Sequence, residues 1–211
     1  MSRLRAWFAA HWQTLLNVYL FVNLAGWLAW DLCGKWRGGK LDYVEVSFAL
    51  QNCLWISMVL IRRQHLAVDR NVFNQLVAVV AFFSGLAMPA TAPSGPPMAI
   101  GISSGLILAS NVFGAITVLN LGRSFGILIA MRGVRTGGLY RLVRHPMYAT
   151  DLLLRAGYVV SHFGWVNLVI VAASGLCYVY RALQEEKFLA EWPEYREYMA
   201  RVRYRFVPGI W

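Results

Sequence analysis

Two short segments in the C-terminal third of the sequence combine residue types that could do chemistry. The first, residues 137–148, runs from a glycine pair through Arg144 and His145 to Pro146, which opens an apolar stretch. The free amides at the start of a helix suit an anion or a polar cofactor group. The segment is therefore a candidate ligand site, although a basic loop beside a lipid surface would have the same composition.

The second segment places two adjacent carboxylates, Glu185 and Glu186, near the end of the last long apolar run. Two acids at a helix C-terminus oppose the helix dipole, so the helix must continue or the acids must have partners. Arg181 lies one turn before Glu185 and could pair with it on the helix surface. Both segments flank one short helical hairpin, which would bring them to the same end of the molecule.

The elements that position these residues are expected to be membrane helices. The 211-residue sequence is 58% hydrophobic and 14% charged, whereas soluble domains carry about 25% charged residues. A spanning helix needs roughly 20 mainly apolar residues. We therefore expect an all-α, polytopic transmembrane helical bundle of five to six spans. The expected spans are residues 12–31, 43–61, 72–90, 98–121, 147–163 and 165–183.

The chain divides into two expected regions. Residues 1–121 form an N-terminal four-helix transmembrane region, and residues 122–211 hold both candidate segments. The hairpin carries Asp151 and Arg155 four residues apart on one helical face, so we expect protein to shield them from lipid. Amphipathic cytoplasmic tail helices follow, the last of them starting with Pro193 at its first position.

The basic residues indicate how the bundle is oriented. Lys and Arg outnumber Asp and Glu by 20 to 10, and positive loops remain on the cytoplasmic side of membrane helices. If six spans alternate, only Lys35, Arg37 and Lys40 lie opposite the N-terminus. We therefore expect an integral membrane protein of the bacterial inner membrane, with both termini and the candidate site facing the cytoplasm. Its expected partner is the lipid bilayer, and no nucleic acid is expected.

At these residues the sequence resembles the isoprenylcysteine carboxyl methyltransferase family, particularly its short prokaryotic members. The resemblance covers residues 119–211, whereas the first 118 residues contribute only hydropathy. The motifs, in order, are Leu121-Gly122-Arg123-Ser124-Phe125, Gly138-Leu139-Tyr140, Arg144-His145-Pro146-Met147-Tyr148, Arg181 four residues before Glu185-Glu186, the pair Tyr195 and Tyr198, and Arg205-Phe206-Val207-Pro208.

The resemblance implies S-adenosylmethionine as the methyl donor, bound between the last helices and the C-terminal segment, with residues 122–211 as the cofactor-binding and catalytic region. Its pocket would be lined by Tyr140, Arg144, His145, Pro146, Tyr148, Glu185 and Glu186. The catalytic residues would be Arg181, which would position the acceptor, and His145 or Glu185 as a base. No metal is implied. The acceptor would be a lipophilic small molecule or a prenylated, isoprenylcysteine carboxylate-like compound that enters from the bilayer.

Two other functions remain open at this point. The run from His145 to Asp151 also resembles membrane sterol reductases, so an NADPH-dependent reductase of a sterol or isoprenoid lipid is the enzyme alternative. Pro146 and the short chain favour the methyltransferase. A non-catalytic membrane accessory or transport protein is the second alternative, because Asp151 and Arg155 inside a span would suit a transport path.

Overall fold

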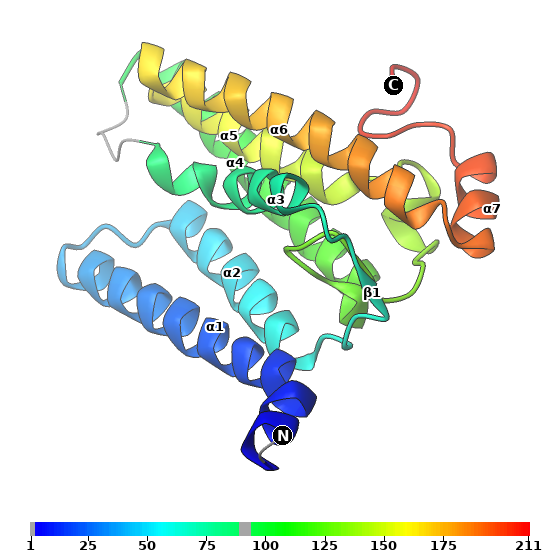
Figure 1. Cartoon of the computed structure of the whole chain (residues 1–211). Coiled ribbons are helices and arrows are strands. Elements are labelled where there is room, and N and C mark those ends of the chain that lie inside the picture. Colours follow the sequence, from blue (N-terminus) through cyan, green and yellow to red (C-terminus); the bar gives the residue numbers. More distant parts are fainter. Residues whose placement is uncertain (1–2, 89–93) are drawn as a thin grey trace.

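A computed structural model describes residues 3–88 and 94–211, which form a bundle of helices (Figure 1). The long helices are α1 (Arg3–Arg37), α2 (Tyr43–Ile61), α4 (Pro97–Leu121) and α6 (Trp165–Leu189). The shorter helices are α3 (Val72–Phe83), α5 (Pro146–Ser161) and α7 (Pro193–Arg201). Single 3₁₀ turns are η1 (Ser84–Ala87), η2 (Gly122–Ser124) and η3 (Gly138–Arg141). The structure is 74% helical with almost no strand, which agrees with the all-α prediction.

Local sequence explains where several helices begin. The Asp42 side chain caps α2 by accepting a hydrogen bond from the amide of Glu45, and Asn71 caps α3 in the same way. Helices α5 and α7 begin with Pro146 and Pro193, whose fixed backbone angle suits the first helical position. The predicted start of the tail helix at Pro193 is therefore confirmed.

Not every predicted span is long enough to cross a membrane unaided. Four helices among the described residues have the required length and hydropathy: His11–Arg37, Tyr43–Ile61, Pro97–Ser124 and Trp165–Leu189. Val72–Ala87 is apolar but shorter, and α5 has only 16 residues. The predicted end of the third span, residues 89–90, lies outside the described residues. The count of five to six spans thus stays a prediction, whereas the helical membrane bundle does not depend on it.

Consecutive helices run in opposite directions, so the two candidate segments meet at one end of the bundle. The end of α6, the tail helix α7 and the segment before α5 gather there (Figure 1). A two-stranded antiparallel sheet braces this end, with β1 (Ala67–Val68) paired to β2 (Ala130–Met131). The sheet ties the linker after α2 to the loop after α4. Strands of two residues leave no periodicity in a sequence, which is why this pairing was not predicted.

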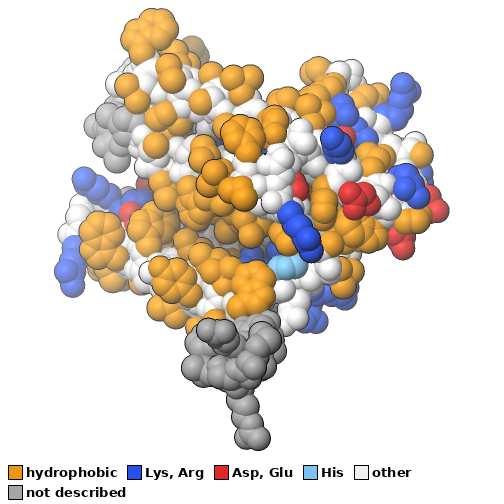
Figure 2. Space-filling model, in the orientation of Figure 1, with side chains coloured by type: hydrophobic (Ala, Val, Ile, Leu, Met, Phe, Trp, Pro, Cys, Tyr) orange, Lys and Arg blue, Asp and Glu red, His pale blue; other side chains and the backbone are white. Residues whose placement is uncertain are grey.

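The core lies between α2, α3, α5 and α6, and it reaches the site. Its buried residues are Val59, Ala81, Phe125, Ile127, Met147, Tyr148, Tyr178 and Ala182. Helices α4 and α5 pack most extensively, and Gly157 permits their approach because a Cβ there would lie 2.9 Å from Leu106 Cβ. Figure 2 shows hydrophobic side chains over the middle of one face and charged ones toward its ends, as lipid contact requires.

Candidate active site

A cavity of about 720 Å³, open to solvent, lies at the end of the bundle where the two candidate segments meet. Its walls come from the loop after α4, from η3 and the start of α5, from the end of α6, and from α7. Of the predicted site residues, Tyr140, Arg144, His145, Tyr148 and Glu185 line the cavity. Pro146, Arg181 and Glu186 do not line it.

Glu186 lies behind the cavity wall and holds three basic side chains. Its Oε1 is 3.0 Å from both Arg144 Nε and His145 Nε2, and its Oε2 accepts from Arg205 Nε at 3.0 Å. The side chain is only 8% exposed. His145 is further fixed by stacking on Tyr148, with ring centroids 5.2 Å apart. Glu186 therefore positions His145 and occupies its Nε2, which leaves Nδ1 as the only ring nitrogen for another partner.

Glu185 differs from its neighbour because it faces the cavity. Its carboxylate accepts a hydrogen bond from the hydroxyl of Tyr148, and it forms no ion pair with any residue in the described ranges. Two adjacent glutamates thus have separate positions: Glu186 lies behind the wall with its basic partners, and Glu185 lines the cavity. Adjacent glutamates of the same type cannot be distinguished before the helix is placed.

The predicted ion pair between Arg181 and Glu185 is wrong. Arg181 points instead into the bundle and donates to three backbone carbonyls: Ala78 O at 3.1 Å, Ile127 O at 2.6 Å and Gly126 O at 3.4 Å. Its guanidinium also lies 5.0 Å from the centre of the Tyr148 ring. These carbonyls accept from both terminal nitrogens of the buried guanidinium, which contacts the cavity only through the ring of Tyr148.

The C-terminal tail forms part of the cavity wall. Tyr195 and Tyr198 of α7 line it, and the Tyr198 hydroxyl donates to Tyr140 O at 2.8 Å. Burial raises the pKa of Tyr140 and Tyr195, so both phenols stay neutral at physiological pH. Past α7, the backbone carbonyl of Tyr204 accepts from the Arg144 amide at 2.9 Å.

The C-terminal residues and Gly138 together fix the backbone conformation of residues 137–148. The carbonyl of Arg205 accepts from the His145 amide at 2.8 Å. Gly138 has φ +59°, and a Cβ there would overlap the side chain of Asn120. Only glycine meets both conditions without strain, so the glycine pair places Tyr140 in the wall.

Arg132 is a cavity residue that sequence reasoning missed. It is 7% exposed and lies against Gly126, where a Cβ would overlap its guanidinium. It makes no hydrogen bond or ion pair with the residues that the structure describes, and its buried Nε lacks a partner. Burial, with the charges of Arg62 and Arg181, lowers the pKa of Arg132 to about 10, so it stays cationic at neutral pH. In the sequence it is one arginine among several in a polar loop.

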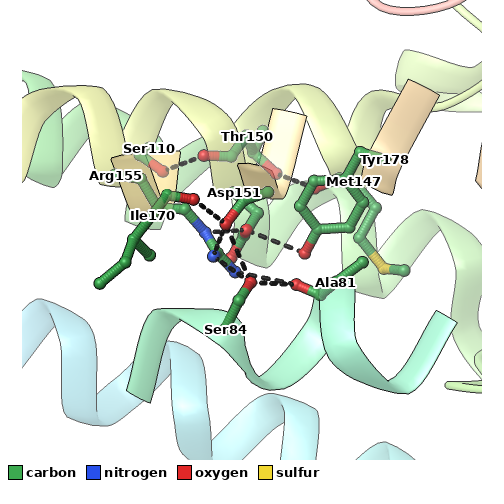
Figure 3. Close-up of polar contacts among 10 residues, drawn as sticks. Ala81, Ser84, Ser110, Met147, Thr150, Asp151, Arg155, Ile170 and Tyr178 are labelled. Atoms are coloured by element: carbon green, nitrogen blue, oxygen red, sulfur yellow. Dashed lines mark hydrogen bonds and ion pairs between the residues drawn. The ribbon is translucent and has the colours of Figure 1, made fainter. Parts of the chain in front are cut away.

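The buried pair in the hairpin has a different environment (Figure 3). The Arg155 guanidinium donates to Asp151 Oδ2 at 2.6 Å, Ser84 Oγ at 2.6 Å, Ser174 Oγ at 2.7 Å and Ala81 O at 3.1 Å. The Tyr178 hydroxyl also donates to Asp151 Oδ2, at 2.9 Å. The predicted shielding of Asp151 and Arg155 is confirmed. Each guanidinium nitrogen of Arg155 has a protein partner, so this side chain links α5 to α6 and η1.

Comparison with known proteins finds a family match for part of the chain. Residues 97–195 match the sequence model of the phospholipid methyltransferase family. The match runs from the first residues of α4 to Tyr195 in α7, so it includes both candidate segments. No curated protein sequence matches the chain. Residues 97–195 are therefore a domain of the phospholipid methyltransferase family, the family of isoprenylcysteine carboxyl methyltransferase-like membrane methyltransferases.

Proposed function

We propose that this chain is an S-adenosylmethionine-dependent methyltransferase that binds its donor in the cavity at the end of the bundle. The observation that carries the proposal is the composition of the cavity wall: four tyrosines face one unpaired carboxylate, Glu185. Aromatic faces and a carboxylate attract a cation that lacks N–H donors, as a sulfonium does.

The residues present fit the other parts of this donor as well. Arg132, Arg135 and Arg144 line the same cavity, and any of these guanidiniums can bind a carboxylate through paired hydrogen bonds. Glu185 can accept hydrogen bonds from ribose hydroxyls or from an ammonium group. The donor would supply a methyl group on a positively charged sulfur. The chain would align the acceptor with that methyl and exclude water, which together provide much of the catalysis in a displacement.

The acceptor in this proposal is a lipophilic molecule that reaches the cavity from the bilayer, and the cavity faces the cytoplasm of a bacterial cell. The arginine-rich segments at the cavity end support this orientation, because such segments stay on the cytoplasmic side. Lipid access is supported by the apolar surface of α1, where Trp12, Leu15 and Tyr19 are 45%, 40% and 64% exposed.

The test is calorimetric titration of S-adenosylmethionine, and separately of NADPH, into detergent-purified protein. We expect S-adenosylmethionine to bind and Glu185→Gln to weaken it about tenfold or more, the cost of one charge-assisted contact. Glu197→Gln is the matched control, because Glu197 is exposed on α7 and outside the cavity wall.

Three outcomes would contradict the proposal. Binding of NADPH without S-adenosylmethionine would favour the reductase alternative, despite the family match. Binding of neither would favour a non-catalytic accessory protein. Equal affinities of the wild type and Glu185→Gln for S-adenosylmethionine would show that the donor lies elsewhere.

A further inference from the structure

The ring of Tyr148 belongs to a stack of three aromatic side chains that continues from the cavity wall into the bundle. Its centroid is 5.2 Å from that of the His145 ring and 4.9 Å from that of the Tyr178 ring, with interplanar angles of 8° and 18°. Tyr148 and His145 line the cavity, whereas Tyr178 does not. The stack therefore connects the candidate site to a residue of α6 that lies outside it.

A carboxylate fixes the ring at each end of this stack. His145 Nε2 lies 3.0 Å from Glu186 Oε1, and the Tyr178 hydroxyl donates to Asp151 Oδ2 at 2.9 Å (Figure 3). Asp151 is fixed in turn by Arg155, which donates to the same oxygen at 2.6 Å. The position of the Tyr178 ring thus depends on the buried pair in the hairpin, which has no direct contact with the cavity.

Tyr148 carries the influence of the stack to the carboxylate in the cavity. Its hydroxyl donates to Glu185, and within the described residues this is the one hydrogen bond of the Glu185 side chain. The position of the Tyr148 hydroxyl therefore decides where the charge of Glu185 lies in the cavity. Tyr148 and Tyr178 are 4% and 3% exposed, and in a close-packed interior neither ring can move without its neighbour.

We propose that Asp151 and Tyr178 are positioning residues for the donor site. Asp151 fixes Tyr178, the Tyr178 ring fixes the ring of Tyr148, and Tyr148 places the Glu185 carboxylate in the cavity. The proposal rests on the proposed function, because the main quantity to be measured is the affinity for S-adenosylmethionine. It gives the buried pair of Asp151 and Arg155 a consequence for the cavity, although neither residue touches a ligand there.

The test is calorimetric titration of S-adenosylmethionine into the full detergent-purified chain and its variants. Tyr178→Phe removes only the hydroxyl that Asp151 accepts from, and we expect it to weaken donor binding about threefold, as the loss of one hydrogen bond would. Tyr178→Leu also removes the stacked ring. It should weaken donor binding about tenfold, the upper end of the range for an aromatic pair.

A double-mutant cycle separates positioning from a general effect on the fold. In a Tyr148→Phe background, Tyr178→Phe should leave the donor affinity unchanged, because the hydroxyl through which Tyr178 acts on Glu185 is absent. A residue that only stabilises the bundle would not show this dependence. Asp151→Asn is the conservative variant. Its amide oxygen can accept from both Tyr178 and Arg155, which share one oxygen in the wild type, so the donor affinity should stay within about twofold.

Tyr180→Phe is the matched control on the same helix. The Tyr180 hydroxyl donates to Asn74 Oδ1 at 2.8 Å, so this variant also loses one hydrogen bond, but Tyr180 does not line the cavity. Its donor affinity should equal that of the wild type. Thermal unfolding followed by tryptophan fluorescence shows whether each variant has folded. If Tyr178→Leu does not fold, Tyr178→Phe carries the test, because it keeps the ring.

Failure of this inference can be distinguished from failure of the proposed function. If the wild type and Tyr178→Phe bind S-adenosylmethionine equally well, or if Tyr178→Phe weakens binding as much in the Tyr148→Phe background, the positioning proposal is overturned and the methyltransferase proposal is not. A wild type that does not bind S-adenosylmethionine contradicts the methyltransferase proposal. The positioning is then tested without donor: the losses in unfolding free energy of Tyr178→Phe and Glu185→Ala should not add, because Tyr148 links the two residues, and additive losses would overturn it.

Discussion

Two groups of buried arginines in this molecule differ in what surrounds them. Arg155, 3% exposed, has Asp151 and three oxygen partners from neighbouring segments. Arg132, 7% exposed, lies beside Arg62 and has no such partners among the described residues. Both lie in an apolar protein at similar burial. The difference separates a guanidinium whose hydrogen bonds the fold completes from one that faces a cavity without hydrogen-bond partners among the described residues.

The comparison also shows why an ionisable residue inside a membrane protein does not by itself mark a functional site. Such residues are functional candidates by default, and Asp151 with Arg155 attracted that interpretation in the sequence. Their completed hydrogen bonds favour a structural role. The site is better recognised by the hydrogen bonds that buried polar atoms lack.

The largest expected effect on stability concerns Arg155, the arginine with a complete set of partners. Arg155→Leu leaves Asp151 buried without a counter-charge, and we expect it to lower the free energy of unfolding by about 3 kcal/mol or more. Equilibrium unfolding of the detergent-solubilised protein measures this. Adding Asp151→Asn removes the stranded charge and should recover part of the loss. A loss below about 1 kcal/mol for the single variant would contradict the comparison.

The adjacent glutamates provide a matched pair for the next effect. Glu186→Gln removes the charge that holds Arg144, His145 and Arg205, and we expect a loss of about 2 kcal/mol in stability. Glu185→Gln should cost less than about 1 kcal/mol, because the Tyr148 hydroxyl can still donate to the amide oxygen. The same unfolding assay measures both losses. Equal losses would show that the carboxylates of Glu185 and Glu186 do not differ in their structural role.

Removing the unpartnered charge should affect stability little. We expect the free energy of unfolding of Arg132→Gln to stay within about 1 kcal/mol of the wild type, or to rise, because an uncompensated buried cation is lost. The measurement is again equilibrium unfolding without added lipid. A loss as large as that of Arg155→Leu would show that Arg132 has a structural partner and would weaken the comparison.

The smallest effect concerns pH. The pKa of His65 is lowered in the folded chain, so folding resists its protonation. Its contribution to stability is therefore complete above about pH 6.5, the ordinary value, and declines as the pH falls below it. Unfolding temperatures of the wild type between pH 7.5 and 5.5 should fall more steeply than those of His65→Gln. Parallel pH profiles would contradict this.

Much of the fold could be predicted because its signals are local. The second predicted span, residues 43–61, coincides with α2, and Pro193 begins α7 as expected. The hairpin brought the two candidate segments together because α5 and α6 are joined by a short turn. These features depend on hydropathy and on residues close in sequence.

The parts that could not be predicted depend on contacts between distant segments. Arg181 pairs with carbonyls of Ala78 and Ile127 instead of Glu185, and a carbonyl has no side-chain signature in a sequence. Arg132 looks like its neighbours in an arginine-rich loop until β2 pairs with β1 and buries it. Whether Glu185, His145 and Tyr140 bind a cofactor stays a prediction until ligand binding is measured.

The contacts of Tyr204 and Arg205 have a consequence for biosynthesis. These residues follow every helix of the bundle in the chain, yet they hold the amides of Arg144 and His145 and the carboxylate of Glu186. The ribosome must therefore release them after α1 to α7 before the cavity wall is complete. Insertion into the membrane can proceed on apolar helices alone, and the cavity wall can be completed only after Tyr204 and Arg205 have been synthesised.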